Sequence, residues 1–284
     1  MANETTYALI SSLLPDAWEA ALMYAEQTLV MPGIVQSYGD RTGMVPRKSS
    51  EYAAGTVATG LGETTDISTE QAFTRSLLST LTPQESGTGY LITDRRIESD
   101  DVMDVMADLT EHINYSVFRQ VEAHLLAAMG SITGGTVGAA GSILTWTHVY
   151  NGRAILRNAG VPGPYNVVLH EYSYLKLATV ANIAGLSLPA PLKIRDDIQN
   201  TYYIGTVEDM NIYTTGVLSA GTAVSQGIFN RQALALDVRR ALRIEAQRDA
   251  SKRATEVIPT MIYGYGTWRP TWGVKIISDA STPT

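Results

Sequence analysis

One stretch of helix-forming sequence, residues 99–129, limits the possible folds of this 284-residue chain more than any other feature. It contains neither Pro nor Gly, and its apolar residues recur every three or four positions, which places them on one helix face. These residues are Val102, Met106, Leu109, Ile113, Val117, Val121, Leu125 and Ala128. We expect Ser99 to be the N-cap and Gly130 to end the helix. Such a helix is about 46 Å long. Because no second segment repeats it, we expect it to lie alone along a sheet.

Composition narrows the class of protein. Only 17% of the residues are charged although 45% are hydrophobic, which favours surface that is buried between subunits. The net charge of -7 argues against a protein that binds nucleic acid through a basic patch. The chain has no Cys, which excludes disulfides, thiol nucleophiles and cysteine metal sites. It also has no apolar run of membrane-spanning length and no basic signal region, so we expect a soluble cytosolic protein.

The first third of the chain changes character near Tyr38. Residues 16–31 are typical of an amphipathic helix that Pro32 and Gly33 should stop. Residues 38–97 are rich in Gly, Thr and Ser, with short β-prone pieces and too few large apolar residues for a core of their own. We interpret this region as a projecting arm that needs a partner surface.

The second half of the chain reads as a mixed α/β layer. We expect a helix over residues 147–160 with Thr147 as its cap, a short buried strand from Asn166 to His170, and a helix that begins at Glu171. Further strand-like runs are expected at residues 202–217, 228–249 and 256–277.

The long helix carries two acid–histidine combinations that could serve as catalytic or metal-binding groups. They are Glu111–His112 and Glu122 with His124, and neither has the His-Glu-x-x-His spacing that brings two imidazoles onto one helix face. We therefore interpret both as parts of an exposed face. His148, in the first turn of its own helix, is interpreted as a surface residue.

The best enzymatic candidate is the pair His170 and Glu171. They stand at a strand-to-helix junction, where α/β enzymes often place active-site residues. No nucleophile elbow or paired-carboxylate motif accompanies them. The sequence thus gives little support to a catalytic role for this pair.

Two other clusters have structural explanations. Four glycines could suggest a phosphate-binding loop, but they follow a helix and lack a Gly-Lys-Ser/Thr ending, so we interpret them as a flexible connector. They are Gly134, Gly135, Gly138 and Gly141. Two acidic groups lack the EF-hand spacing, and we assign them to helix caps and solvated loops. They are Asp196–Asp197 and the trio Asp100, Asp101 and Asp104.

Charge is distributed unevenly along the chain. Seven bases lie close together, at Arg231, Arg239, Arg240, Arg243, Arg248, Lys252 and Arg253. The long helix is acidic, with Asp100, Asp101, Asp104, Asp108, Glu111 and Glu122 against Arg119. These segments could pair across a subunit boundary, or each could be neutralised within its own chain. The sequence leaves both alternatives open.

The order of these features resembles the major capsid proteins of tailed bacteriophages, which have the Hong Kong 97 (HK97) fold. The resemblance runs from about Tyr38 to Ile277 and includes two local phrases. One is VPGPYNVVLH, which follows a helix, and the other is the closing segment from RDASKRATEVI to YGYGTWRPTWGV.

The resemblance implies an α+β, HK97-like fold with four parts. They are an N-terminal arm at residues 1–37, an extended β-hairpin loop with leading strands at 38–98, a peripheral domain at 99–146 and 251–284 with the spine helix 99–129, and an axial domain at 147–250. It also implies that the strands between Glu256 and Ile277 complete the sheet of the peripheral domain.

The resemblance further implies a structural, non-enzymatic protein with no catalytic residue, cofactor or metal site. It would self-assemble into hexamers and pentamers of an icosahedral virion shell, built in the host cytoplasm, around double-stranded DNA contacted non-specifically. Expected partners are a separate scaffolding protein, a portal and a decoration protein. No motif marks Lys48 as a cross-linking residue. The alternatives are an encapsulin shell that encloses a cargo enzyme, and a small α/β enzyme that uses His170 and Glu171.

Overall fold

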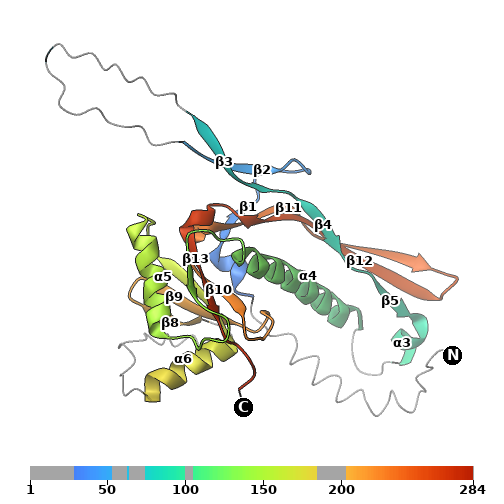
Figure 1. The fold of residues 1–284 in the computed structure, drawn as a ribbon. Helices are drawn as coiled ribbons and strands as arrows, with labels where there is room; N and C mark the ends of the chain where they lie inside the picture. The colour runs from blue at the N-terminus through green and yellow to red at the C-terminus, as the bar shows by residue number, and fades with distance from the viewer. Residues whose placement is uncertain (1–28, 53–62, 64–73, 100–104, 184–202, 284) are drawn as a thin grey trace.

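A computed structural model describes residues 29–52, 63, 74–99, 105–183 and 203–283. Two sheets share the long helix between them, and a separate two-stranded ribbon projects from one side (Figure 1). Most of the expected N-terminal helix, residues 16–28, lies outside the described residues. None of the helices in the described part of the chain combines the length and apolar character needed to cross a bilayer.

The long helix is α4, Val105–Met129, and it ends before Gly130 as predicted. Of the expected apolar stripe, the described side chains are buried, namely Val117, Val121, Leu125 and Ala128. Its start differs from the prediction. Ser99 is the last residue of a separate short helix, α3 (Asp94–Ser99), so it is not the N-cap of α4. Residues 100–104, with three of the first-turn carboxylates, lie outside the described residues.

The tertiary contacts of Asp94 explain why α3 is separate. The Asp94 backbone N–H donates to the carbonyl of Arg253 at 2.9 Å, and its carboxylate is held by Arg248. These contacts fasten the chain to the far end of a long hairpin before α4 begins. The polar sequence from 94 to 99 carries no periodic signal that would reveal this arrangement.

A five-stranded sheet lies against α4. Its central strands form an antiparallel hairpin, and the order is β1-β11-β12-β4, with β5 also paired to β12. Its strands are β1 (Gln36–Tyr38), β4 (Gln84–Gly87), β5 (Tyr90–Thr93), β11 (Leu234–Asp249) and β12 (Ala254–Thr267). Beside β1, the short helix α2 (Met31–Ile34) contains Pro32 and Gly33, which we expected to end a helix. Pro32 is tolerated because it lies in the first turn, where no N–H is required.

A six-stranded sheet forms the second layer, in the order β6-β13-β10-β7-β9-β8. Its strands are β6 (Thr136–Gly138), β7 (Tyr165–His170), β8 (Tyr203–Val207), β9 (Met210–Thr215), β10 (Val224–Asn230) and β13 (Gly273–Ser278). Every residue of β7 is buried, as predicted. Val167 and Leu169 face one apolar cluster with the helices α5 (Trp146–Asn158) and α6 (Glu171–Ile183), whereas Val168 faces the other cluster with α2 and α4. Both faces of this sheet are therefore covered.

The two helices beside β7 confirm the predicted mixed α/β layer. They are α5 (Trp146–Asn158) and α6 (Glu171–Ile183), and α6 begins at the predicted residue. The cap of α5 differs from the prediction, because Thr145 takes that role in place of Thr147. The backbone N–H of Thr145 donates to Nδ1 of His148 at 3.2 Å, so His148 completes a capping box.

Strand pairing departs from the boundaries expected between the peripheral and axial parts. Residues 256–277 do not complete one sheet, because β12 pairs with β11 whereas β13 pairs with β10 and β6. Likewise β11, within the expected axial range, belongs to the sheet on α4. The chain crosses between sheets at Arg269 and the 3-10 turn Pro270–Trp272, where Pro270 cannot donate to a ladder.

The glycine-rich segment after α4 is not the flexible connector that we expected. It forms β6, and its glycines allow backbones to approach closely. A Cβ at Gly134 would lie 2.3 Å from the carbonyl oxygen of Gly273, and a Cβ at Gly138 would lie 2.3 Å from that of Ile277. Gly138 also has φ +81°, which strains other residues.

The expected arm is divided between these layers. Strands β4 and β5 join the sheet on α4, whereas β2 (Arg47–Tyr52) and β3 (Arg75–Leu81) pair only with each other. We expected the arm to have no core of its own. Its inner part differs from this expectation, because Leu81 and Ile92 are buried. Residues 53–62 and 64–73 lie outside the described residues.

Candidate assembly surface

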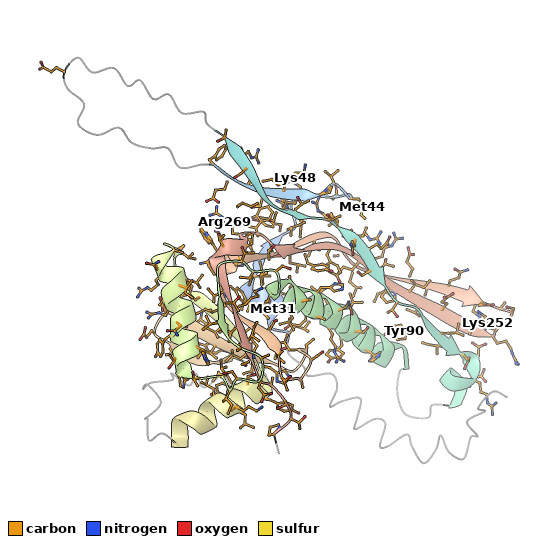
Figure 2. The ribbon with its side chains drawn as sticks, in the orientation of Figure 1. Met31, Met44, Lys48, Tyr90, Lys252 and Arg269 are labelled. Carbon is orange, nitrogen blue, oxygen red and sulfur yellow. The ribbon has the colours of Figure 1, made fainter. Side chains whose placement is uncertain are left out.

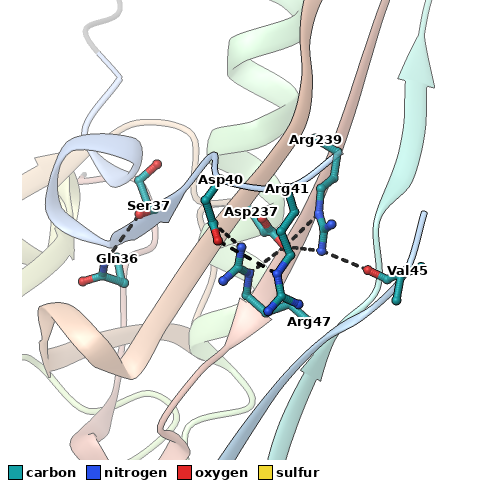
Figure 3. Close-up of polar contacts among 8 residues, drawn as sticks. All are labelled: Gln36, Ser37, Asp40, Arg41, Val45, Arg47, Asp237 and Arg239. Atoms are coloured by element: carbon teal, nitrogen blue, oxygen red, sulfur yellow. Dashed lines mark hydrogen bonds and ion pairs between the residues drawn. The ribbon is translucent and has the colours of Figure 1, made fainter. Parts of the chain in front are cut away.

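A buried ion cluster fixes the base of the β2–β3 ribbon (Figure 3). The Asp237 carboxylate, fully buried on β11, accepts from Nε of Arg47 at 3.1 Å and from Nη2 of Arg239 at 2.7 Å. Arg47 also pairs with Asp40, and its guanidinium lies 4.3 Å from the ring centroid of Tyr38. One side chain on β2 is thus held by groups from β1, from β11 and from the loop between β1 and β2.

The charges in this cluster are interdependent. Burial disfavours the charged form of Arg47, but the hydrogen bonds that its guanidinium donates to Asp237 and Asp40 outweigh burial and raise the Arg47 pKa. Removing one partner of a buried ion pair typically costs about 3–5 kcal/mol, because the other charge stays buried and unpaired. The cluster therefore makes the direction of the ribbon a firm property of the subunit.

Beyond its base, the ribbon exposes apolar side chains. Four of the ten large hydrophobic residues exposed in the described part of the chain lie on the ribbon or directly before it. They are Met44 at 53% exposed, Val45 at 70%, Tyr52 at 50% and Leu77 at 60%. Isolated two-stranded ribbons are marginally stable in water. This surface gains free energy when another surface covers it.

Two residues of α4 contradict the expectation of an exposed face. Glu122 is 1% exposed and accepts the backbone N–H of Met31 at 2.8 Å. His124 is half-buried, with its Nδ1 2.9 Å from the hydroxyl of Tyr263 and its ring stacked on Tyr265 at 4.4 Å between centroids. Burial lowers the pKa of His124. Both side chains face inward because α4 is packed between α2 and β12.

An open groove of about 390 Å³ lies beside His124, between α4 and β4. Its lining includes the polar side chains of Glu85, Ser86, Tyr90 and Gln120. His112 stands near it, exposed, with its ring edge toward Tyr90 at 5.8 Å between centroids. No three His, Asp or Glu side chains gather as a metal site requires anywhere in the described ranges.

The structure gives His170 a structural role. It is 4% exposed, and its Nδ1 accepts the backbone N–H of Tyr172 at 3.0 Å, which caps α6. Burial lowers its pKa despite the neighbouring charge of Glu171, whose own side chain is exposed. Its backbone N–H donates to Oε1 of Gln226 at 3.1 Å. The two residues are adjacent but do not face a common cavity among those found in the described residues.

Five of the bases on β11 and on the turn that follows it form ion pairs with acids of the same chain. Each pair joins one base to a nearby acid: Arg239 to Asp237, Arg240 to Glu85, Arg243 to Glu245, Arg248 to Asp94 and Lys252 to Asp249. None of these acids lies on α4. These five bases thus have acidic partners within their own chain, which favours the intramolecular alternative. The candidate aspartates 100, 101, 104, 196 and 197 lie outside the described residues.

Sequence reasoning missed Asp237 and Glu122, although each had a signal. Glu122 follows Val121 and lies three residues before Leu125, which puts it at the edge of the predicted apolar stripe, where an acid is out of place. Asp237 follows Leu234, Ala235 and Leu236 at the start of β11, and all four residues are buried. An acid on an apolar face predicts a buried partner.

Comparison with known proteins identifies the fold. No protein-family model and no curated protein matches the chain. A chain from Mycobacterium phage Che8 has 18% identity and a TM-score of 0.65, with 88% of this chain and 91% of that chain covered. The capsid of Cyanophage P-SCSP1u has 13% identity and a TM-score of 0.66, with 90% of this chain and 90% of that chain covered. The Cyanophage Pam1 capsid has 12% identity and a TM-score of 0.63, with 88% of this chain and 89% of that chain covered. Such identities show the fold alone. The predicted α+β, HK97-like capsid fold is confirmed.

Proposed function

We propose that this chain, which has the HK97-like capsid fold, is a major capsid protein. It self-assembles into hexamers and pentamers that close an icosahedral shell around double-stranded DNA. The observation that carries the proposal is the β2–β3 ribbon, which is rigidly anchored at its base and exposes Tyr52 and Leu77 beyond it. A subunit gains little from holding such a ribbon in place unless a second copy covers it.

The ribbon supports closed assembly for a physical reason. Its base is fixed by Asp237, Arg47 and Arg239, so every copy presents it in the same direction. A surface that binds a different patch on the next copy forms a head-to-tail contact, and such contacts generate rings when the rotation closes. Many modest contacts of this kind can then stabilise a large shell.

The parts of the subunit keep their proposed roles. Residues 1–37 act as the N-terminal arm, 38–98 as the extended loop, 99–146 with 251–284 as the peripheral domain, and 147–250 as the axial domain. The five-stranded sheet with α4 supports the peripheral part and the six-stranded sheet supports the axial part. The exceptions are β11, an axial-range strand in the five-stranded sheet, and β6 and β13, peripheral-range strands in the six-stranded sheet. A scaffolding protein, a portal and a decoration protein are the proposed partners, with assembly in the host cytoplasm.

We propose no enzymatic activity, cofactor or metal for this chain. The contacts of His170 support this, because its ring caps α6 and its backbone binds Gln226. His170→Ala should therefore leave particle formation and any catalytic readout unchanged apart from a modest loss of stability. Loss of a measurable turnover in that variant, with particles intact, would establish the enzyme alternative.

The proposal is tested by replacing the segment that joins β2 to β3. Tyr52 pairs with Arg75, so residues 53–74 can be replaced by Asn-Gly, a two-residue hairpin turn. We expect a folded subunit with an unchanged melting temperature that no longer forms shells in negative-stain microscopy, alone or with neighbouring gene products. Normal shells from this variant would contradict the proposal.

A matched pair of point variants separates the ribbon from the rest of the surface. Leu77→Ser, on the ribbon, should reduce assembly, whereas Ile155→Ser, on α5, should reduce it less. Equal effects would show that the ribbon has no special role. The content of wild-type particles decides the remaining alternative: packaged DNA supports the phage capsid, and an enclosed enzyme supports an encapsulin.

A further inference from the structure

The N-terminus of α2 is capped by a side chain from a distant part of the chain. Val30, the N-cap residue, has no side-chain acceptor, and Pro32 has no N–H to offer. The carboxylate of Glu122, on α4, accepts the Met31 N–H at 2.8 Å and also bonds the backbone of Val30. Figure 2 shows Met31 next to α4. Glu122 thus links α4 to the point where the first 28 residues join the described fold.

The surroundings of Glu122 are apolar. It is 1% exposed, and its second oxygen, Oε1, has no hydrogen-bond partner within the described residues. Met31, which it binds, and Leu125, the next turn along α4, belong to one buried apolar cluster. A carboxylate in such a place is costly unless it is well paired or protonated.

Charged groups on the packed elements do not offset this cost. Helix α2 and strand β10 carry no ionisable side chain, and β12 contributes the tyrosines Tyr263 and Tyr265. On β11, Asp237 and Arg239 are paired with each other. On α4 itself, His124 bonds Tyr263 and Gln120. None of these groups shifts the pKa of Glu122, which responds only to burial and to the amides of Val30 and Met31.

We propose that Glu122 is a proton-controlled anchor, which holds α2 against α4 more tightly when the carboxyl is protonated than when it is charged. The ionised form must stay buried with one oxygen unpaired, whereas release of α2 exposes it to water. Deprotonation therefore favours release of α2 from α4. This goes beyond the capsid role and does not depend on it.

The direction of the pH effect follows from linkage. Burial, opposed by the two backbone amides, raises the pKa of Glu122 from 4.5 to about 7. The anchored state thus binds more protons than the released state between these values, so the anchor is strongest below pH 4.5 and weakens as pH rises toward 7. The equilibrium constant for release should rise about tenfold per pH unit in this window and level off above it.

Hydrogen exchange on the full-length protein tests the anchor. Exchange of peptides that cover residues 30–36 is measured from pH 5 to pH 8 in the wild type and in Glu122→Gln. The glutamine is neutral at every pH and keeps a carbonyl for the Met31 N–H. We expect the ratio of exchange rates, wild type over variant, to rise at least tenfold across this range. A constant ratio would overturn the proposal.

Two controls make the result specific. His124→Gln should leave the wild-type pH dependence intact, and its loss in that variant would show that His124 is the group responsible. If Glu122→Gln does not fold, the wild type is compared with its own β7 peptide, residues 165–170, as an internal reference. Protection of residues 30–36 that follows β7 at every pH would then overturn the proposal.

Discussion

The six-stranded sheet and the β2–β3 ribbon differ in how far one chain can complete them. Every residue of β7 is buried, with apolar clusters on both faces of the sheet. On the ribbon, β3 is buried only at Leu81, its last residue, and Leu77 is 60% exposed. The first region has its apolar contacts within the monomer, whereas the described part of the second leaves apolar side chains such as Leu77 exposed.

The buried polar groups of the two regions show the same contrast. In the six-stranded sheet, the side chain of Gln226 donates to Ser173 at 2.9 Å and to Ser278 at 2.7 Å, and it accepts from the His170 N–H. At the ribbon base, Oδ1 of Asp237 has no partner within the described residues. A fully satisfied network rigidifies a core, whereas a partly satisfied one leaves a cost. The free-energy cost of the unpaired Asp237 oxygen therefore falls at the base of the ribbon and not in the six-stranded sheet.

The largest expected effect comes from the same substitution in each region. Val167→Asp puts an unpaired charge on fully buried β7 and should reduce the free energy of unfolding by about 4 kcal/mol or more. Leu77→Asp on the exposed ribbon should change it by less than about 0.5 kcal/mol. Chemical denaturation of the subunit measures both. Equal losses would remove the distinction between the two regions.

A smaller effect is expected at the ribbon base. Asp237→Ala leaves the buried guanidiniums of Arg47 and Arg239 without their shared carboxylate and should cost about 3 kcal/mol. Asp40→Ala removes a partner whose side chain is 62% exposed, so its effect should stay below about 1 kcal/mol. Denaturation midpoints distinguish the two. If Asp237→Ala were as mild as its control, the cluster would not fix the ribbon.

The smallest effect is expected at the edge of the six-stranded sheet. Gly138→Ala combines a φ of +81° with a Cβ 2.3 Å from the carbonyl oxygen of Ile277 and should cost about 2 kcal/mol. Gly141→Ala has a similar φ, +73°, but open space around the Cβ, so only about 1 kcal/mol is expected. Thermal melting of both variants isolates the close backbone approach. Identical losses would show that β6 moves aside without cost.

The local features of the chain could be predicted from its sequence. The apolar spacing from Val117 to Ala128 gave the buried face of α4, and the apolar run before His170 gave β7. Both signals come from residues within a few positions of one another, where helix and strand periods act directly. The resemblance added the fold, which the solved capsid structures confirm.

Only the tertiary structure decided which strands share a sheet and which charges are buried. Glu122 meets Met31 across 91 positions, and Arg47 meets Asp237 across 190. No local period encodes such distances, because these contacts exist only after the sheets have formed. For the same reason the sequence predicted a loop at Gly134 and Gly138, whereas in the structure β13 lies against both residues. The sequence by itself determined the elements and their apolar faces, and long-range packing decided their partners.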